Sequence, residues 1–204
     1  MNVQAKIPRK QPVQSRSKAT CAAVTEATIQ VLMRDGAEAL TTTRVAERAG
    51  VSVGSLYQYF PNKAALIEAV RQQYFAILSN TVQTALGSAA HLPTEQKLAQ
   101  AIEALVKSKR ENLDLNQAMA HAQYGRQSAD FPSEIVAHFS QVVVKLYEPD
   151  RAQALTADDM SQIECTVAAI EGALSYAVKT KPSWLAETWF TNKLIDIAAT
   201  GLPR

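Results

Sequence analysis

A short stretch of small, hydroxylated and aromatic side chains stands out in the first third of the chain. Residues 51–63 read Val-Ser-Val-Gly-Ser-Leu-Tyr-Gln-Tyr-Phe-Pro-Asn-Lys. Leu56 and Phe60 lie four residues apart, so on a helix they face the interior together. The opposite face then presents Val53, Ser55, Tyr57, Gln58 and Tyr59. Such groups form hydrogen bonds and apolar contacts, which is the chemistry required to contact base edges and phosphates in a DNA groove.

A lysine follows directly after this stretch. Pro61 ends the helix, Asn62 is suited to cap the next one, and Lys63 falls in the first turn of that helix. A cation in a first turn opposes the helix dipole. The placement is understandable if Lys63 and the neighbouring N–H groups point at a phosphate.

Two short helices have to position these side chains. The hydroxyl of Thr41 is a suitable N-cap for the first helix, and Gly50 is suited to end it because glycine adopts the left-handed conformation without a Cβ penalty. Ser52 is then a natural N-cap for the second helix, which runs to Tyr59. Two short helices joined by a sharp turn predict a helix-turn-helix.

The segments Thr-Thr-Thr-Arg-Val-Ala at 41–46, Ala-Gly-Val-Ser at 49–52, Gly-Ser-Leu-Tyr-Gln-Tyr-Phe at 54–60 and Lys-Ala-Ala-Leu at 63–66 resemble the DNA-binding domain of the TetR family of bacterial transcriptional regulators. The resemblance covers roughly residues 16–75. It implies a sequence-specific DNA-binding regulator, most simply a repressor. The expected DNA contacts are Thr42, Thr43, Arg44, Ser52, Val53, Ser55, Tyr57, Gln58, Tyr59 and Lys63.

The side-chain types divide these contacts into two groups. Val53 suits a thymine methyl, the Gln58 amide suits adenine and Arg44 suits guanine, with Ser55 as a further reader. Phosphates are expected to be held, and the register set, by Thr42, Thr43, Tyr57, Tyr59 and Lys63. Arg44 and Val53 depart from the family, which often has an acid at the first position and a polar or basic residue at the second.

The composition fits a soluble, cytoplasmic DNA-binding protein. The chain has 204 residues, of which 47% are hydrophobic, and it lacks both a membrane-length apolar run and a signal-peptide core. The charge balance is +5 up to residue 75 and −3 beyond it, so the basic half is the one with the helix-turn-helix. Cys21 and Cys165 lack metal-ligand spacing, which favours free buried thiols over a redox sensor.

The rest of the chain shows helical periodicity without strand alternation, so the predicted fold is all-α. Residues 1–15 are basic and without periodicity; they are expected to be disordered, or to form an arm that reaches the DNA. Residues 16–75 form the helix-turn-helix domain and residues 76–204 a larger helical domain for effector binding and dimerisation. Within the latter, further helices are expected from 95, 112 and 132 onward, the last beginning at Pro132.

Two long apolar segments close the chain, Thr156 to Thr180 and Pro182 to Thr200. Their apolar stripes are wider than one internal helix face needs, which favours a partner surface over a monomeric core, the alternative interpretation. In the TetR family the last two long helices form a four-helix dimer interface. The chain is therefore expected to be a homodimer on a palindromic operator, with half-sites about one helical turn apart.

The intervening region is where the family holds a small-molecule effector. Met119, His121, Tyr124 and Phe139 combine apolar walls with hydrogen-bonding tips, although such residues also build ordinary cores. No cofactor or metal site is predicted, because the three histidines lack acids at ligand spacing.

The motifs of common enzymes are missing as well, so an enzyme is not expected. The alternative to a regulator is an all-helical protein-interaction module without operator-specific DNA binding. Tyr57, Tyr59 and Lys63 argue against that alternative, because nothing explains their clustering on an exposed face unless a groove receives them.

Overall fold

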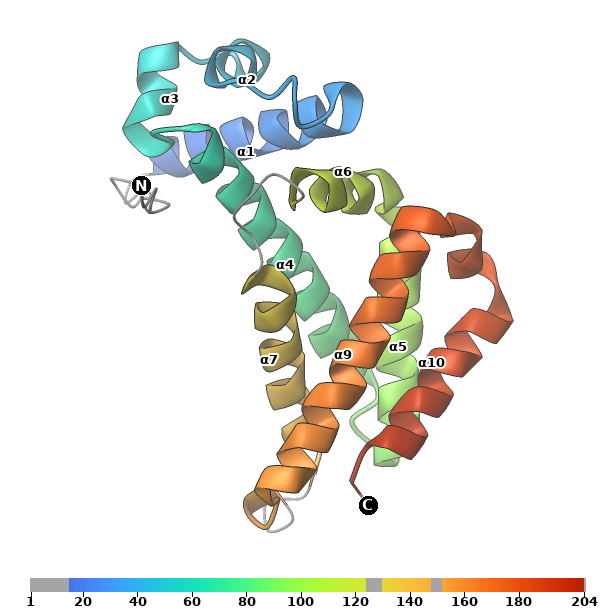
Figure 1. Ribbon diagram of the computed structural model, residues 1–204. Helices are drawn as coiled ribbons and strands as arrows, with labels where there is room; N and C mark the ends of the chain where they lie inside the picture. The colour runs from blue at the N-terminus through green and yellow to red at the C-terminus, as the bar shows by residue number, and fades with distance from the viewer. Residues whose placement is uncertain (1–14, 124–129, 148–151, 204) are drawn as a thin grey trace. The chain divides into compact units, whose positions relative to one another are not determined.

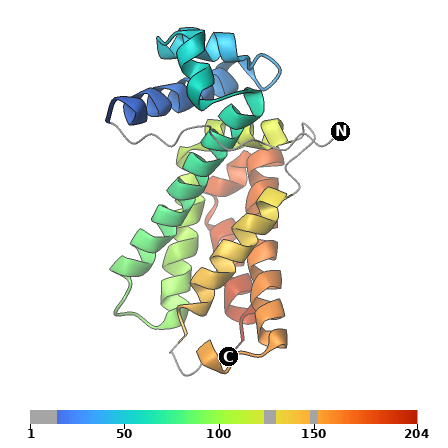
Figure 2. The same cartoon turned by 90° about the vertical axis from the view of Figure 1, so that its left-hand side faces the viewer.

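The computed structural model describes residues 15–123, 130–147 and 152–203, and every regular element within them is helical. The all-α prediction is confirmed (Figures 1 and 2). None of the described helices combines the length and the hydropathy that a membrane span requires. The elements are α1 (Ser15–Asp35), α2 (Thr42–Ala49), α3 (Val53–Tyr59), α4 (Lys63–Ser88), α5 (Thr94–Glu111), α6 (Leu113–Gln123), α7 (Asp130–Val144), α9 (Ala157–Thr180), the 3₁₀ helix η1 (Pro182–Ala186) and α10 (Thr188–Gly201).

The chain separates into two compact units, each with its own core. The first comprises the described residues up to Ala76 together with residues 114–123. Apolar side chains of α1, α2, α3 and α4 fill its interior; among those with 0–1% exposure are Val24, Val31, Val45, Leu56 and Leu66. Burying these side chains fixes α2 and α3 on a small, rigid support.

Helix α6 belongs to this first unit, although it begins 54 residues after the end of α3 (59 to 113) in the sequence. Leu115 and Met119 are buried there, and the hydroxyl of Tyr74 on α4 donates a hydrogen bond to the side-chain oxygen of Asn116. Both residues of this bond are about 5% exposed. Because this buried hydrogen bond pairs both polar groups, it favours one particular packing of α6 against α4.

The second unit comprises residues 77–113 and the described residues from 130 onward. Its core joins α5, α9, η1 and α10 through buried apolar side chains, among them Ile102, Leu174, Leu185, Phe190 and Leu194. Helix α7 packs along α9 in the same unit (Figure 2).

Two element boundaries differ from the sequence-based expectation. Helix α7 begins at Asp130, two residues before Pro132, which is tolerated because first-turn N–H groups have no intrahelical partner. The predicted helix over 182–200 is divided into η1 and α10, with Glu187 in an extended conformation between them. The bounds of α2 and α3 agree with the expected ones within one residue. Residues 1–14 of the predicted basic arm lie outside the described residues.

Thr156 begins α9 with a capping box. Its hydroxyl accepts a hydrogen bond from the Asp159 N–H, and the Asp159 carboxylate accepts one from the Thr156 N–H at 2.8 Å. The expected N-terminus at Thr156 is therefore confirmed.

The far end of α10 is fastened to α9 by a close backbone contact. The Thr166 hydroxyl donates to the Gly201 carbonyl at 2.7 Å, and a Cβ added at Gly201 would lie 2.5 Å from that hydroxyl oxygen. Gly201→Ala should therefore lower the free energy of unfolding by about 1–3 kcal/mol, measured by urea denaturation. Gly87→Ala is the matched control, because no atom lies within 4 Å of a Cβ built there. Equal stability of the two variants would contradict the close approach.

Candidate nucleic-acid interface

The two helices of the helix-turn-helix begin and end as their capping residues dictate. The Thr41 hydroxyl accepts a hydrogen bond from the Arg44 N–H at 3.2 Å, and Gly50 closes α2 with φ 66°. The Ser52 hydroxyl accepts from the Ser55 N–H at 3.1 Å to begin α3. Asn62 caps α4 by accepting from the Ala65 N–H at 2.9 Å. These local bonds fix where α2, α3 and α4 begin, and Gly50 fixes where α2 ends.

Helix α3 has one buried and one exposed face. Leu56 and Phe60 are 0% and 4% exposed, whereas Tyr57 on the other face is 47% exposed. Val53 and Gln58 are exposed as well, and Tyr59 is half-buried. The face therefore offers one apolar group, one amide and two phenols to any groove that receives it.

The exposed ends of α2 and α3 are joined by a hydroxyl pair. Thr42 Oγ1 and Tyr57 Oη are 3.0 Å apart and hydrogen-bonded, so the phenol of α3 is oriented by the first turn of α2. Thr43 beside it is exposed. Similarly, the hydroxyls of Ser52 and Ser55 are 2.8 Å apart. The hydroxyls expected to hold phosphates thus lie on the exposed side of both helices.

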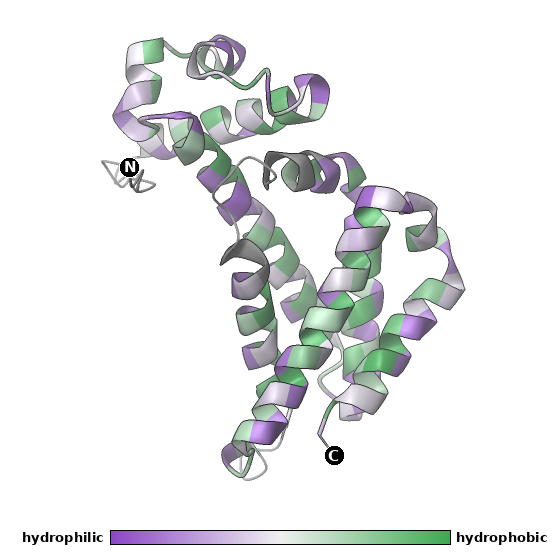
Figure 3. Cartoon of the chain, in the orientation of Figure 1, coloured by the Kyte–Doolittle hydropathy of each residue, from purple (hydrophilic) through white to green (hydrophobic). Residues whose placement is uncertain are grey.

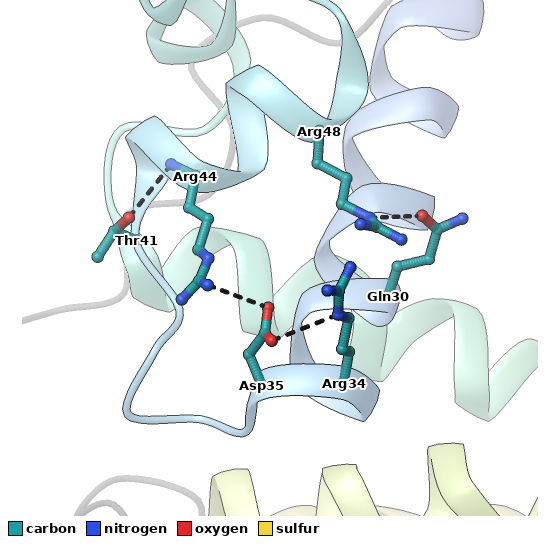
Figure 4. A network of polar contacts seen from close by, with 6 residues as sticks. All are labelled: Gln30, Arg34, Asp35, Thr41, Arg44 and Arg48. Atoms are coloured by element: carbon teal, nitrogen blue, oxygen red, sulfur yellow. Dashed lines mark hydrogen bonds and ion pairs between the residues drawn. The ribbon is translucent and has the colours of Figure 1, made fainter.

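The arginines of α2 reach back to α1 (Figure 4). Arg44 Nη2 lies 3.5 Å from a carboxylate oxygen of Asp35, and its side chain is 50% exposed. Arg48 Nε donates to the Gln30 side-chain oxygen at 2.8 Å. Exposed pairs of this kind contribute little free energy, so both guanidinium groups can exchange them for a stronger anion. In this structure the Arg44 guanidinium faces the end of α1, which the sequence did not reveal.

Lys63 makes a contact that the sequence also did not predict. Its Nζ donates to the Ala37 carbonyl at 2.6 Å, in the loop between α1 and α2. The loop begins at Gly36, whose φ of 79° requires a glycine-like conformation. Lys63 therefore fixes this loop, and a phosphate contact requires it to exchange or share that bond.

Arg71, a further cation of α4, is held within its own helix. Its Nε donates to the Glu68 carboxylate at 2.6 Å. Burial raises the pKa of Glu68, but the hydrogen bonds from Arg71 and Gln72 and the charge of Arg71 outweigh it, so the pKa is lowered. The carboxylate stays ionised at neutral pH, and it holds the Arg71 guanidinium along α4.

Of the four residues expected to line an effector pocket, the structure describes the side chains of two, Met119 and Phe139. Met119 is 2% exposed in the first unit, whereas Phe139 lines a cavity in the second unit. Tyr124 and the side chain of His121 lie outside the described residues. Sequence reasoning missed most of the cavity wall, which consists of aliphatic residues on four helices. Among the described residues, no group of three His, Cys, Asp or Glu side chains is arranged to hold a metal.

The chain is similar to known regulators at two levels. Residues 24–70 match the family model for bacterial regulatory proteins of the tetR family. The HTH-type transcriptional repressor KstR of Mycolicibacterium smegmatis is 33% identical over 100 residues, which are 48% of each chain. The matched segment of this chain therefore spans about half the length of that curated relative.

Two solved structures share the fold over nearly the whole chain. The fatty acid degradation regulator FadR of Bacillus halodurans superposes with a TM-score of 0.64 at 16% identity, covering 95% of this chain and 97% of that one. Thermus thermophilus FadR, a repressor solved in complex with lauroyl-CoA, gives a TM-score of 0.62 at 18% identity, covering 90% and 95%.

The relatives are regulators and not enzymes, in agreement with the sequence-based expectation. The helix-turn-helix and the shared helical fold agree with the family model. Residues 24–70 of the chain match the TetR family of bacterial transcriptional regulators, and this segment contains α2 and α3.

Proposed function

We propose that this protein is a dimeric, effector-controlled repressor that reads a palindromic operator with the exposed faces of α2 and α3. The observation that carries the proposal is the division of α3 into a fully buried face, with Leu56 at 0% exposure, and an open face with Tyr57 at 47%. The basic charge balance of residues 1–75 supports a polyanionic partner for the same unit. A protein-interaction module would not require hydroxyls, phenols and an amide on one short helix.

The proposed DNA contacts divide into side chains that contact base edges and side chains that contact phosphates. Val53, at 37% exposure, is open to a thymine methyl and Gln58 to an adenine edge, with Ser55 beside them. Arg44 reads guanine after leaving Asp35. Phosphates are held by Tyr57, Tyr59 and Lys63, together with the hydroxyls of Thr42, Thr43 and Ser52.

Two substitutions separate these roles. Gln58→Ala should relax base preference at one position of each half-site, with a loss of about 1–3 kcal/mol of discrimination. Lys63→Ala should weaken binding to all duplexes alike and reduce the slope of log affinity against log salt by about one unit. The measurement is a salt titration by fluorescence anisotropy on a duplex selected from genomic DNA and on its single-base variants.

Two controls distinguish a lost DNA contact from a general loss of charge or of folding. Lys107 is 66% exposed on α5 in the second unit, and Lys107→Ala should leave both slope and preference unchanged. Melting curves of Lys63→Ala report whether loss of the Ala37 contact unfolds the headpiece. A folded Lys63→Ala variant with the wild-type salt slope would remove Lys63 from the phosphate contacts.

Dimerisation is proposed through α9 and α10. One exposed stripe of α9 consists of small residues and one aromatic ring, listed here: Cys165, Ala168, Ala169, Gly172 and Tyr176. The exposed side of a solvated helix normally carries charged and polar residues. Trp189 of α10 is 51% exposed, and Figure 3 shows hydrophobic residues along both helices. An open apolar surface of this kind is suited to a two-fold partner surface that brings two headpieces to one operator.

Effector control is proposed for the second unit, with the protein acting on DNA in the cytoplasm. The Thermus relative in complex with lauroyl-CoA is a precedent for a small molecule with a hydrocarbon chain in this fold. An effector releases the operator only if it binds the non-binding conformation more tightly than the DNA-binding one.

A further inference from the structure

We infer that a cavity in the second unit binds a hydrocarbon group of an effector and leaves the polar head of that effector outside. The inference rests on the proposed effector control and names the chemistry of the ligand. The cavity has a volume of about 80 Å³ and lies among α4, α5, α7 and α9. Leu78, Ala101, Phe139 and Leu174 each contribute to its wall from a different one of these helices.

The wall of the cavity has no polar atom at its open surface. A buried water needs two to four polar partners, so water gains nothing by entering. Apolar cavities that stay dry bind apolar molecules; one of about 150 Å³ takes up benzene. At roughly half that size, this cavity accepts a chain of a few carbons as it stands.

Glu171 is the one ionisable residue among those that line the cavity. Its carboxylate lies 3.6 Å from Lys109 Nζ; the Lys109 side chain is buried at 4% exposure, and the Glu171 side chain is partly buried at 18%. The carboxylate is therefore directed at Lys109, and the cavity meets the carbon atoms of Glu171. A charged or hydroxylated end of a ligand would find no hydrogen-bond partner inside. The part that enters is thus hydrocarbon throughout.

Primary alcohols of increasing length test this inference on the full-length protein. Calorimetric titration with ethanol, propanol, butanol and octanol should show an affinity gain of about fourfold per added CH₂ for the short alcohols, from roughly 0.8 kcal/mol per buried CH₂, and a smaller gain per CH₂ once the cavity is full. Octane-1,8-diol should bind at least about tenfold more weakly than octanol, because one hydroxyl would be buried without a partner.

A cavity-filling substitution locates the bound chain. Ala101 is 7% exposed and lines the cavity, so Ala101→Leu should lower octanol affinity at least about tenfold while the protein stays folded. Ala104→Leu on the same helix is the matched control, because Ala104 does not line the cavity, and it should bind as wild type does. If Ala101→Leu fails to fold, Val143→Ile fills the cavity from α7 with one methylene and should lower octanol affinity about threefold.

The outcomes separate the cavity from the regulatory function. Equal binding of octanol by wild type and the filled variant, or equal binding of octanol and the diol, would overturn the inference even if operator binding is intact. Octanol binding with the expected trend supports it. If octanol binding leaves operator affinity unchanged in an anisotropy titration, the inference about the cavity stands, and the proposal that this cavity controls operator binding is wrong.

Discussion

Gly172→Glu should convert the protein into a folded monomer that has lost at least about 100-fold in affinity for its palindromic duplex. Gly172 lies on the exposed stripe of α9, and no atom lies within 4 Å of a Cβ built there. The glutamate therefore fits the single chain, and it raises the helix propensity of the position. In a symmetric dimer the same side chain meets the partner's α9 with its bulk and with a like charge.

Sedimentation velocity measures the oligomeric state, and anisotropy measures the affinity for the duplex. Gly87→Glu is the matched control, since Gly87 is also an exposed helical glycine with nothing within 4 Å of a Cβ. It should stay dimeric and bind DNA as wild type does. A dimeric Gly172→Glu with wild-type affinity would place the dimer interface elsewhere.

Lys109→Met should lower the free energy of unfolding by about 3–5 kcal/mol. Lys109 and Glu171 join α5 to α9 inside the second unit, with the lysine side chain 4% exposed. Removal of the lysine leaves a carboxylate 18% exposed beside an apolar cavity, and desolvating an unpaired charge is costly. Urea denaturation monitored by circular dichroism measures the effect.

The double variant Lys109→Met with Glu171→Leu should recover most of that loss, because it removes both charges together. Lys107→Met is the control, since Lys107 forms an exposed pair with Glu111 at 3.9 Å on the same helix, and its effect should stay below about 1 kcal/mol. A double variant no more stable than Lys109→Met would show that the lysine acts through its packing and not through its charge.

Local chemistry was predictable from the sequence wherever one residue determines it. Thr41, Gly50, Ser52 and Asn62 form the caps and the turn as their types dictate, so the helix-turn-helix and its exposed face follow from the residues alone. The division of residues 182–200 was not predictable, because the apolar period continues through Glu187 while the backbone turns there.

Contacts between segments distant in the chain could not be predicted from the sequence. The pairing of Lys63 with the Ala37 carbonyl and of Arg44 with Asp35 depends on how α1 packs against α2. The cavity was not predicted for the same reason. The sequence gives an apolar face for each of four helices, but it does not show which of these faces pack together. One indication was present: Lys109 and Glu171 interrupt otherwise apolar stripes, next to Val106 and Ile170. Opposite charges on two apolar faces are a reason to expect a buried pair.

The chain's tryptophans have a practical consequence. Trp184 and Trp189 are the two in the sequence, and their rings lie 5.2 Å apart between centroids, next to Tyr176 and Phe190. Intrinsic tryptophan emission therefore originates wholly from η1 and α10, with no contribution from the reading helices. Dilution of the unlabelled protein should shift the wavelength of that emission as the proposed dimer dissociates. DNA contacts at α3 should not change it directly, because α3 contains no tryptophan.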